Sequence, residues 1–384
     1  MLKKLFFYFL LMNAILIAQS NVNPDISLIG TFDTYMNFDK NTPDYGKLLF
    51  DMPSLELFIE GYLNPYARAA ANIAFEEGEF HAEELYAQIL RGLPLDIQIK
   101  AGKYLLGFGK INTLHPHAWP FLDRPLWQQI YFGDEGFNDY GADVNFILPT
   151  TDFYSTLDLG VYSGNSMARN TAGEDADPTE VRGNSLIFVG RLGSFFSLSD
   201  FNNLDVGLDG SFGNYAKSSF YIPDSIGFPE QMLKYFYGGF DFKFKYKPDS
   251  YTSLVIQGEA ILNNRDVIRG TETEPVVETI STYGAFIYFD YQFMKQFSIG
   301  AKYDFTFGVI GDDYSASTLS NDDVNKTSGI EGWIGYYPVE ETLAFRLSTQ
   351  YLYFILPDGM SKEGDTTITL QMIFSLGPHK AHQF

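Results

Sequence analysis

The chain has 384 residues, no cysteine, a formal net charge of −22 and many aromatic residues, with 26 Tyr and 36 Phe. The absence of cysteine excludes a disulfide-based scaffold and a lipid-anchored lipoprotein, and the acidity argues against a nucleic-acid-binding protein. Although 45% of the residues are hydrophobic, no run beyond the N-terminus approaches the roughly 20 apolar residues of a transmembrane helix.

The chain begins with MLKKLFFYFLLMNAILIAQS. Two lysines precede an apolar run from Leu5 to Ala18, which is the arrangement of a secretory signal peptide. A membrane-anchoring helix is the alternative, but the run is shorter than such a helix needs. We therefore predict a signal peptide at residues 1–18, a barrel at residues 19–377 and a periplasmic tail at residues 378–384.

The segments that follow show the two-residue period of β-strands. Within Tyr237–Pro248, aromatic residues alternate with Asp241, Lys243 and Lys245, which indicates that the aromatic side chains face lipid and the charged ones face water. Short turns alternate with longer polar loops, as in outer-membrane proteins. The pattern predicts an all-β, antiparallel transmembrane barrel of about sixteen strands with both termini in the periplasm. A soluble β-sandwich or propeller is the alternative.

The longer polar stretches are the expected external loops. They are Asn37–Lys47, Leu105–Asn138, Gly164–Gly183, Tyr215–Glu230, Asn263–Glu278, Gly311–Thr327 and Pro357–Gly364.

By strand count, Leu105–Asn138 is the third external loop. A long, aromatic, charged loop inside a strand array is usually functional, and we predict that this loop folds into the lumen and narrows it. The tryptophans have alternative roles in a membrane-interface belt or in loop packing. The adjacent Asp and Arg have an alternative role as a local salt bridge that fixes the loop. The predicted constriction residues are His115, His117, Trp119, Asp123, Arg124 and Trp127.

Four of the five histidines fall into two groups, in this loop and in the tail GPHKAHQF. An extended H-x-H segment places both imidazoles on one side, as zinc and copper sites often need. A joint site requires the loop and the tail to enter the lumen from opposite ends, and the alternative is a set of hydrogen-bonded structural histidines. We therefore predict no cofactor, and zinc is the one alternative. The candidate metal ligands are His115, His117, His379 and His382.

The strand period also predicts which charged residues face the lumen. Both signs occur, which favours a hydrated lumen of weak selectivity. A modest acidic excess favours cations, whereas Lys243 and Lys245 form a local basic ladder that leaves an anion path open. The predicted lumen charges are Lys100, Arg191, Asp241, Lys243, Lys245, Glu259, Asp304 and Arg346.

The segment GKYLLGFGKINTLHPHAWPFLDRP and the ending FSLGPHKAHQF resemble a family of bacterial outer-membrane porin-like proteins with an HPHxW…DRP loop. Members are often labelled zinc-regulated outer-membrane receptors, and the lead-in is more distantly similar to phosphate-selective porins. The resemblance implies a barrel and solute passage. Barrel-like alternation begins by about Ile26, so we expect no plug domain of an energised receptor. The residues that match the family pattern are His115, Pro116, His117, Trp119, Asp123, Arg124 and Pro125.

These features predict a bacterial outer-membrane channel for passive diffusion of small hydrophilic solutes or ions. An outer-membrane zinc-binding or zinc-uptake receptor is the alternative. A barrel enzyme is a third interpretation, but no nucleophile beside a base and its orienting group stands out, so we expect no enzymatic activity. The expected partners are the solutes and outer-membrane lipid. Small lipid-facing residues at Ala67, Ala69 and Ala71 are compatible with a homotrimer.

Overall fold

The computed structural model describes residues 24–40, 42–76, 78–133, 135–166, 186–217, 232–271, 274–307, 326–339, 342–355 and 361–377. The predicted signal peptide and the predicted tail, with His379 and His382, lie outside these ranges. Within them, no helix is both long enough and apolar enough to cross a membrane. The helical segments that lie wholly within the described ranges are the α-helix α2 (Leu126–Phe132) and the 3₁₀ turns η1 (Pro94–Asp96), η2 (Ile111–Thr113) and η3 (Pro116–Ala118).

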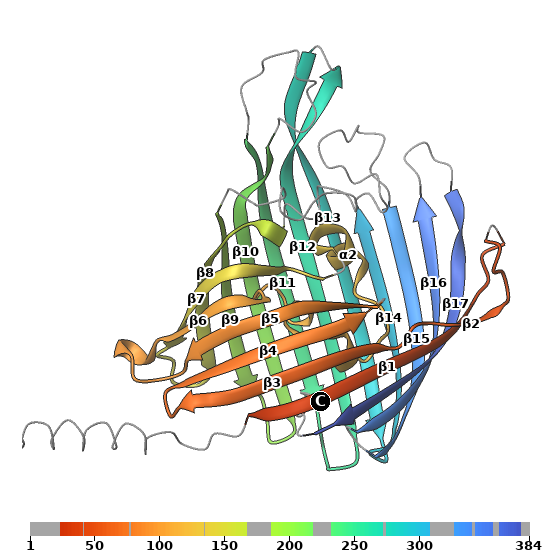
Figure 1. Cartoon of the computed structure of the whole chain (residues 1–384), viewed down its shortest axis with the longest axis horizontal. Helices are drawn as coiled ribbons and strands as arrows, with labels where there is room; N and C mark the ends of the chain where they lie inside the picture. The colour runs from red at the N-terminus through yellow and green to blue at the C-terminus, as the bar shows by residue number, and fades with distance from the viewer. Residues whose placement is uncertain are drawn as a thin grey trace, which may run out of the picture.

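The described strands form one antiparallel sheet that closes into a barrel (Figure 1). They are β1 (Asp25–Asn37), β2 (Leu48–Phe50), β3 (Ser54–Asn64), β4 (Ala67–Glu76), β5 (Glu79–Ile89), β6 (Gln98–Leu105), β7 (Asn138–Leu148), β8 (Tyr154–Tyr162), β9 (Ile187–Ser197), β10 (Asn202–Lys217), β11 (Met232–Tyr246), β12 (Ser253–Thr271), β13 (Glu274–Phe293), β14 (Phe297–Phe307), β15 (Lys326–Val339), β16 (Leu343–Ile355) and β17 (Ser361–Leu376). Closure comes from β1, which pairs with β3 on one side and β17 on the other. The predicted sixteen-strand barrel is confirmed, with the short β2 paired beside β1.

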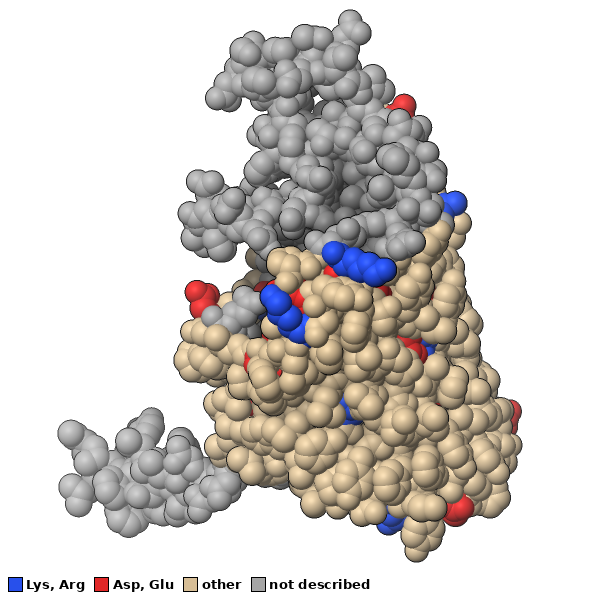
Figure 2. All heavy atoms as spheres, turned by 90° about the vertical axis from the view of Figure 1, so that its right-hand side faces the viewer, with Lys and Arg blue, Asp and Glu red and all other residues tan. Residues whose placement is uncertain are grey.

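The two faces of the wall differ as the sequence period predicts. In β11 the side chain of Asp241 is fully buried on the lumen side, whereas Phe240 is 45% exposed on the outside. In β13, Ile287 and Phe289 are each 46% exposed. Figure 2 shows a broad band of the outer surface that few charged side chains interrupt. An apolar belt outside and polar groups inside are the reverse of a soluble fold, so the sandwich alternative is wrong.

The connections at the two ends of the barrel differ in length. At the end where β1 begins and β17 finishes, the turns are short, as between Asn64 and Ala67 and between Phe293 and Phe297. At the opposite end, one prediction is wrong. Asn263–Glu278 is a continuous hairpin, since β12 and β13 remain paired as far as Thr271 and Glu274. This hairpin rises beyond the neighbouring strands (Figure 1). Cross-strand hydrogen bonds between β12 and β13 pair the backbone of this hairpin.

The apolar belt makes a quantitative prediction. Ile287→Lys in β13 should lower the free energy of unfolding by about 2–4 kcal/mol, since a lysine facing the bilayer midplane must be desolvated. Val277→Lys, in the projecting part of the same strand, is the matched control and should have a much smaller effect. Urea titration of both variants in lipid vesicles measures the difference. Equal stabilities would contradict the proposed position of the lipid belt.

Candidate functional site

The connection between β6 and β7 folds into the barrel, and we call residues 106–137 the inner loop. It is the third connection at the end opposite the termini, as predicted, and it lies inside the ring of strands in Figure 1. Its base is closed by the pair Leu105–Asn138 and by a bond of 2.8 Å from the Leu106 amide to the Phe137 carbonyl oxygen. The buried Asn112 donates to both the Leu106 and Phe137 carbonyls. These bonds fix the neck of the loop.

Aromatic rings attach one side of the inner loop to the barrel wall. Phe132 stacks on Phe137 at 4.6 Å and meets Trp127 edge-on at 5.4 Å, and both phenylalanines contact Tyr237 of β11. Such pairs contribute about 0.5–1.5 kcal/mol each beyond area burial. Trp127 is almost fully buried, and a Cβ at Gly284 of β13 would overlap the Trp127 Cβ. The predicted loop packing therefore describes Trp127, whose ring does not line the open lumen.

Strands β12–β16 form the part of the barrel that we call the far wall. Carboxylates of this wall accept hydrogen bonds from the loop backbone. Glu259 of β12 accepts from the amides of Lys110 and Ile111, each at 2.8 Å. Glu331 of β15 accepts from the Leu122 amide at 2.9 Å. Asp304 of β14 lies 3.4 Å from the Leu126 amide at the start of α2. Because irregular backbone must find partners when it is buried, these acids hold the loop inside the barrel.

Cations of the same wall bind the loop carbonyl oxygens. Arg346 of β16 donates to the carbonyls of Trp119 at 2.7 Å and Phe121 at 3.1 Å. Lys302 of β14 donates to the Asp123 carbonyl at 2.9 Å and forms an ion pair of 3.1 Å with Glu331. Glu259, Asp304 and Arg346, predicted as lumen charges, thus contact the inner loop inside the barrel, and Arg346 also borders a cavity there. They are loop anchors, because the buried backbone needs donors and acceptors.

Two of the predicted lumen charges, Arg191 and Asp241, pair with each other. Arg191 of β9 bonds Asp209 and Asp241 at 2.6 Å each. Both carboxylates are buried, and one guanidinium fork joins β9, β10 and β11 on their lumen side. Arg191 and Asp241 therefore face the lumen, as predicted, in an ion cluster.

The three predicted lumen lysines lie in different surroundings. Lys100 of β6 lies 3.9 Å from the ring centroids of both Tyr86 and Tyr104, which is cation–π geometry. Lys243 of β11 borders the main cavity together with Lys100. Lys245 follows on the same face of β11, two residues along. The basic ladder thus lies on the lumen side, as predicted.

The remaining predicted constriction residues divide between packing and surface. Trp119 is buried against Phe121, and the Arg124 guanidinium lies 4.9 Å from the Trp119 ring centroid. Arg124 also donates to Gln128 at 3.5 Å. Asp123 is exposed while Arg124 is buried. Asp123 is thus accessible to solvent, whereas Arg124 packs on the Trp119 ring.

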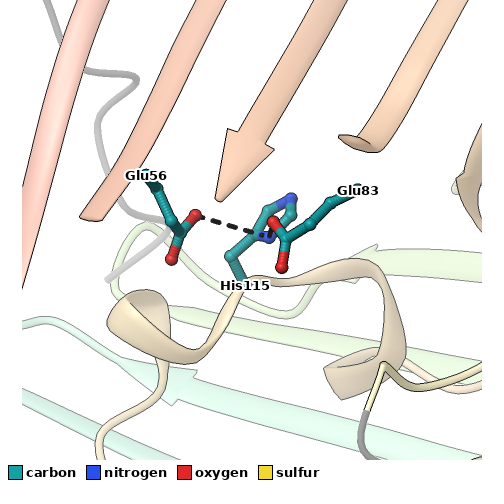
Figure 3. Close-up of side chains that lie close together, drawn as sticks. All are labelled: Glu56, Glu83 and His115. Atoms are coloured by element: carbon teal, nitrogen blue, oxygen red, sulfur yellow. Dashed lines mark ion pairs between the residues drawn. The ribbon is translucent and has the colours of Figure 1, made fainter. Parts of the chain in front are cut away.

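His115 and His117 contact β3 and β5, the part of the barrel that we call the near wall. Their rings are parallel, 5.9 Å apart, so they share one side as predicted, although the segment is the 3₁₀ turn η3 and not extended. His117 Nδ1 lies 2.9 Å from Glu56 of β3. His115 lies 3.5 Å from Glu56, 3.3 Å from Glu83 and 3.5 Å from Glu84. Figure 3 shows the Glu56 and Glu83 carboxylates on either side of the His115 ring.

A β-bulge in β5 explains how two consecutive glutamates reach the same histidine. Asn72 pairs with Glu84 and Ile73 pairs with Ala82, so Glu83 is the extra residue. A bulge re-aims side chains, and here both Glu83 and Glu84 contact His115 inside the barrel. The sequence pattern did not predict that Glu83 and Glu84 contact the loop. The available signal was their adjacency, because regular alternation would turn one of them to lipid.

The acids change the ionisation of His115. Burial disfavours a charged imidazole, but hydrogen bonds with Glu83 and Glu84 and the charge of Glu56 outweigh it and hold the pKa of His115 well above its ordinary value. This shift favours the charged form of His115, which balances part of the surrounding negative charge.

A cavity of about 520 Å³ lies between the inner loop and the barrel wall. Its lining includes Glu56, Glu84, Lys100, Lys110, His115, His117, Trp119, Lys243, Asp290 and Arg346. β3 and β11 are eight strands apart in the sixteen-strand ring, so Glu56 and Lys243 border this cavity from opposite walls. The lining thus combines charges of both signs with aromatic and aliphatic side chains.

Comparisons with known proteins agree with this architecture. No protein-family model matches the chain. An uncharacterized protein of Aquifex aeolicus (strain VF5) is 26% identical over 345 residues, covering 87% of this chain and 70% of that protein. Among solved structures, the fold is similar to an anion-selective porin from Comamonas acidovorans, with a TM-score of 0.57, 10% identity and coverage of 92% of this chain and 100% of that chain.

Two further solved structures are similar. The outer membrane channel DcaP of Acinetobacter baumannii has a TM-score of 0.54 and 12% identity, covering 92% of this chain and 97% of that chain. OmpT of Vibrio cholerae in its trimer form has a TM-score of 0.53 and 8% identity, covering 93% and 100%. A closed barrel with an apolar outer belt satisfies every backbone group within lipid. The chain is therefore a bacterial outer-membrane β-barrel protein.

The anchoring role of Glu259 is testable by proteolysis. Glu259→Ala leaves the Lys110 and Ile111 amides without their acceptor, at a cost of about 1–3 kcal/mol for each buried group. Trypsin should then cleave the folded protein after Lys110 faster than it cleaves the unaltered chain. Glu79→Ala, an exposed change at the start of β5, is the control and should leave cleavage unchanged. Equal rates in all three proteins would show that Glu259 does not hold the loop.

Proposed function

We propose that this protein is a porin-like channel for passive diffusion of small hydrophilic solutes or ions across the outer membrane. One observation carries the proposal: the inner loop crosses the lumen and borders a cavity of about 520 Å³ that charged side chains of both signs line together with apolar ones. A loop fixed to both walls narrows a barrel without filling it. The similarity of the fold to solved outer-membrane porins supports the same function.

The lining favours small polar solutes over apolar ones. Glu56 and Glu84 border one side of the cavity and Lys243 the other, so a passing ion meets both signs of charge. Rings or walls of charge set ion preference in pores. With both signs present and the strongest ion pairs already formed within the wall, we expect weak selectivity.

An outer-membrane zinc receptor is the second candidate function. His115 and His117 lie beside the carboxylates of Glu56, Glu83 and Glu84, and imidazole and carboxylate are ligands that zinc accepts. A receptor retains its cargo, whereas a channel releases it quickly. Stable zinc retention by a folded barrel that carries no current would favour the receptor.

The functional unit that we propose is a homotrimer in outer-membrane lipid. Ala67, Ala69 and Ala71 alternate with the lumen-facing Ala70 and Asn72 and so lie on the outer face of β4. Small outward side chains allow two barrel walls to approach closely. The trimer form of the structurally similar OmpT supports this arrangement.

Loop deletion tests the constriction. Removal of His115–Arg124 should raise single-channel conductance severalfold, because it removes the part of the loop that crosses the lumen. Conductance is measured in planar bilayers, and heat-modifiable migration on gels verifies that the variant is folded. Glu79→Ala is the control outside the loop. An unchanged conductance would refute the constriction and leave the barrel intact.

Charge substitution tests the path of the ions. Lys243→Gln removes a positive charge from the cavity lining and should shift the reversal potential toward cation preference in a salt gradient. Lys247→Gln, on the exposed turn after β11, is the matched control and should shift it less. If the two variants behave alike, ions do not pass Lys243.

A further inference from the structure

The side chains around His115 have the composition and spacing of a metal centre. One atom each from Glu56, Glu83 and His115 lie within 4.8 Å of one another. They come from β3, β5 and the inner loop, and Asn72 of β4 lies among them. We propose that these four residues bind one divalent cation of the zinc class and that the ion joins the inner loop to the near wall.

The donor separations fit a small tetrahedral ion. Zinc binds nitrogen and oxygen at about 2.0–2.1 Å, which places the ligand atoms of a tetrahedron roughly 3.3 Å apart. His115 Nδ1 lies 3.3 Å from Glu83 Oε2 and 3.5 Å from Glu56 Oε2. Charge-assisted hydrogen bonds are usually shorter, about 2.7–2.9 Å. These two separations therefore leave room for an ion between the donors.

Asn72 supplies the fourth position. Its Nδ2 lies 3.1 Å from Glu56 Oε2, 2.8 Å from Glu83 Oε2 and 3.2 Å from His115 Nδ1. The residue is 1% exposed, and none of the described residues hydrogen-bonds its Oδ1. A half-turn of the amide exchanges the two atoms and brings this oxygen to the fourth vertex. In that orientation the oxygen gains the ion as its partner, and Nδ2 takes the position that the oxygen leaves.

Outer hydrogen bonds orient two of the ligands. Glu84 Oε2 lies 3.5 Å from His115 Nε2, so a proton on Nε2 leaves Nδ1 for the ion. Glu84 is itself fixed by the Leu105 amide at 3.0 Å. His117 Nδ1 binds Glu56 Oε1 at 2.9 Å and leaves Oε2 toward His115. Carboxylate partners of ligating histidines are a common feature of zinc sites.

Binding would place an ion of two positive charges between His115 and the two glutamates. The ion would neutralise Glu56 and Glu83, and it reaches them through the cavity that Glu56, Asn72 and His115 border. The site deepens the receptor interpretation of the proposed function by naming its ligands. Its chemistry rests on these contacts and holds whether or not the barrel conducts.

Zinc competition with a chromophoric chelator tests the site on the folded, full-length barrel in detergent. The background variant is His379→Ala/His382→Ala, which removes the tail histidines. We expect one zinc ion per chain in this background, affinity at least tenfold weaker with Glu83→Gln, and no binding with His115→Ala. Glu60→Gln, on the same strand as Glu56, and His81→Ala, a histidine outside the cluster, are matched controls that should keep the affinity.

Cobalt in place of zinc reports the geometry by visible absorption, and intense bands of a four-coordinate ion are expected. Weak six-coordinate bands or a background variant that binds no zinc would overturn the proposal. So would Glu83→Gln and His115→Ala variants that bind zinc as tightly as the background variant does. Glu83→Gln preserves shape, so it remains informative if His115→Ala does not fold. A barrel that conducts but binds no zinc refutes this site and leaves the channel proposal standing.

Discussion

The inner loop has an irregular backbone, and the buried amides and carbonyls of that backbone must be paired inside the barrel. The wall supplies the partners as side chains: Glu259 accepts two loop amides, and Arg346 donates to two loop carbonyls. Each such bond contributes about 1.5–3 kcal/mol when one partner is charged. The course of the loop, the shape of the cavity and the position of the histidines all depend on this pairing.

Pairing with the far wall also explains why the loop reaches the near wall. Between its anchors to β12 and β16, the loop passes through η3, and the turn presents both histidine rings to β3 and β5. Acidic residues there face a histidine cation, whereas the far wall presents acids and bases to neutral backbone groups. The lumen is thus bridged by two kinds of contact. The aromatic cluster around Phe132 fixes the loop in a third direction.

Local patterns predicted the barrel, because the two-residue period needs only a few neighbouring residues. The same reasoning predicted the inward loop and its packed tryptophans. It did not predict that Glu259, Asp304 and Arg346 would hold the loop, since each partner lies far away in sequence: Arg346 and Trp119 are separated by 227 positions. Glu83 was missed because a bulge interrupts the period locally. The prediction of a loop at Asn263–Glu278 was wrong, because β12 and β13 stay paired as far as Thr271 and Glu274. The tail histidines lie outside the described residues, so their predicted role stays a prediction.

The central claim is that the inner loop lies inside the barrel against β13. Because the chain has no cysteine, the double substitution W127C/G284C tests it directly by cross-linking. The two Cβ positions lie closer than the 3.5–4.5 Å of a disulfide, so a shift of the loop by about 1 Å brings them to bonding distance, and we predict disulfide formation in the folded barrel under mild oxidation. W127C/A74C, with its second position on the lumen side of β4, should remain reduced. Failure of the first pair to cross-link in a heat-modifiable, folded protein, or equal cross-linking of both pairs, would contradict the account.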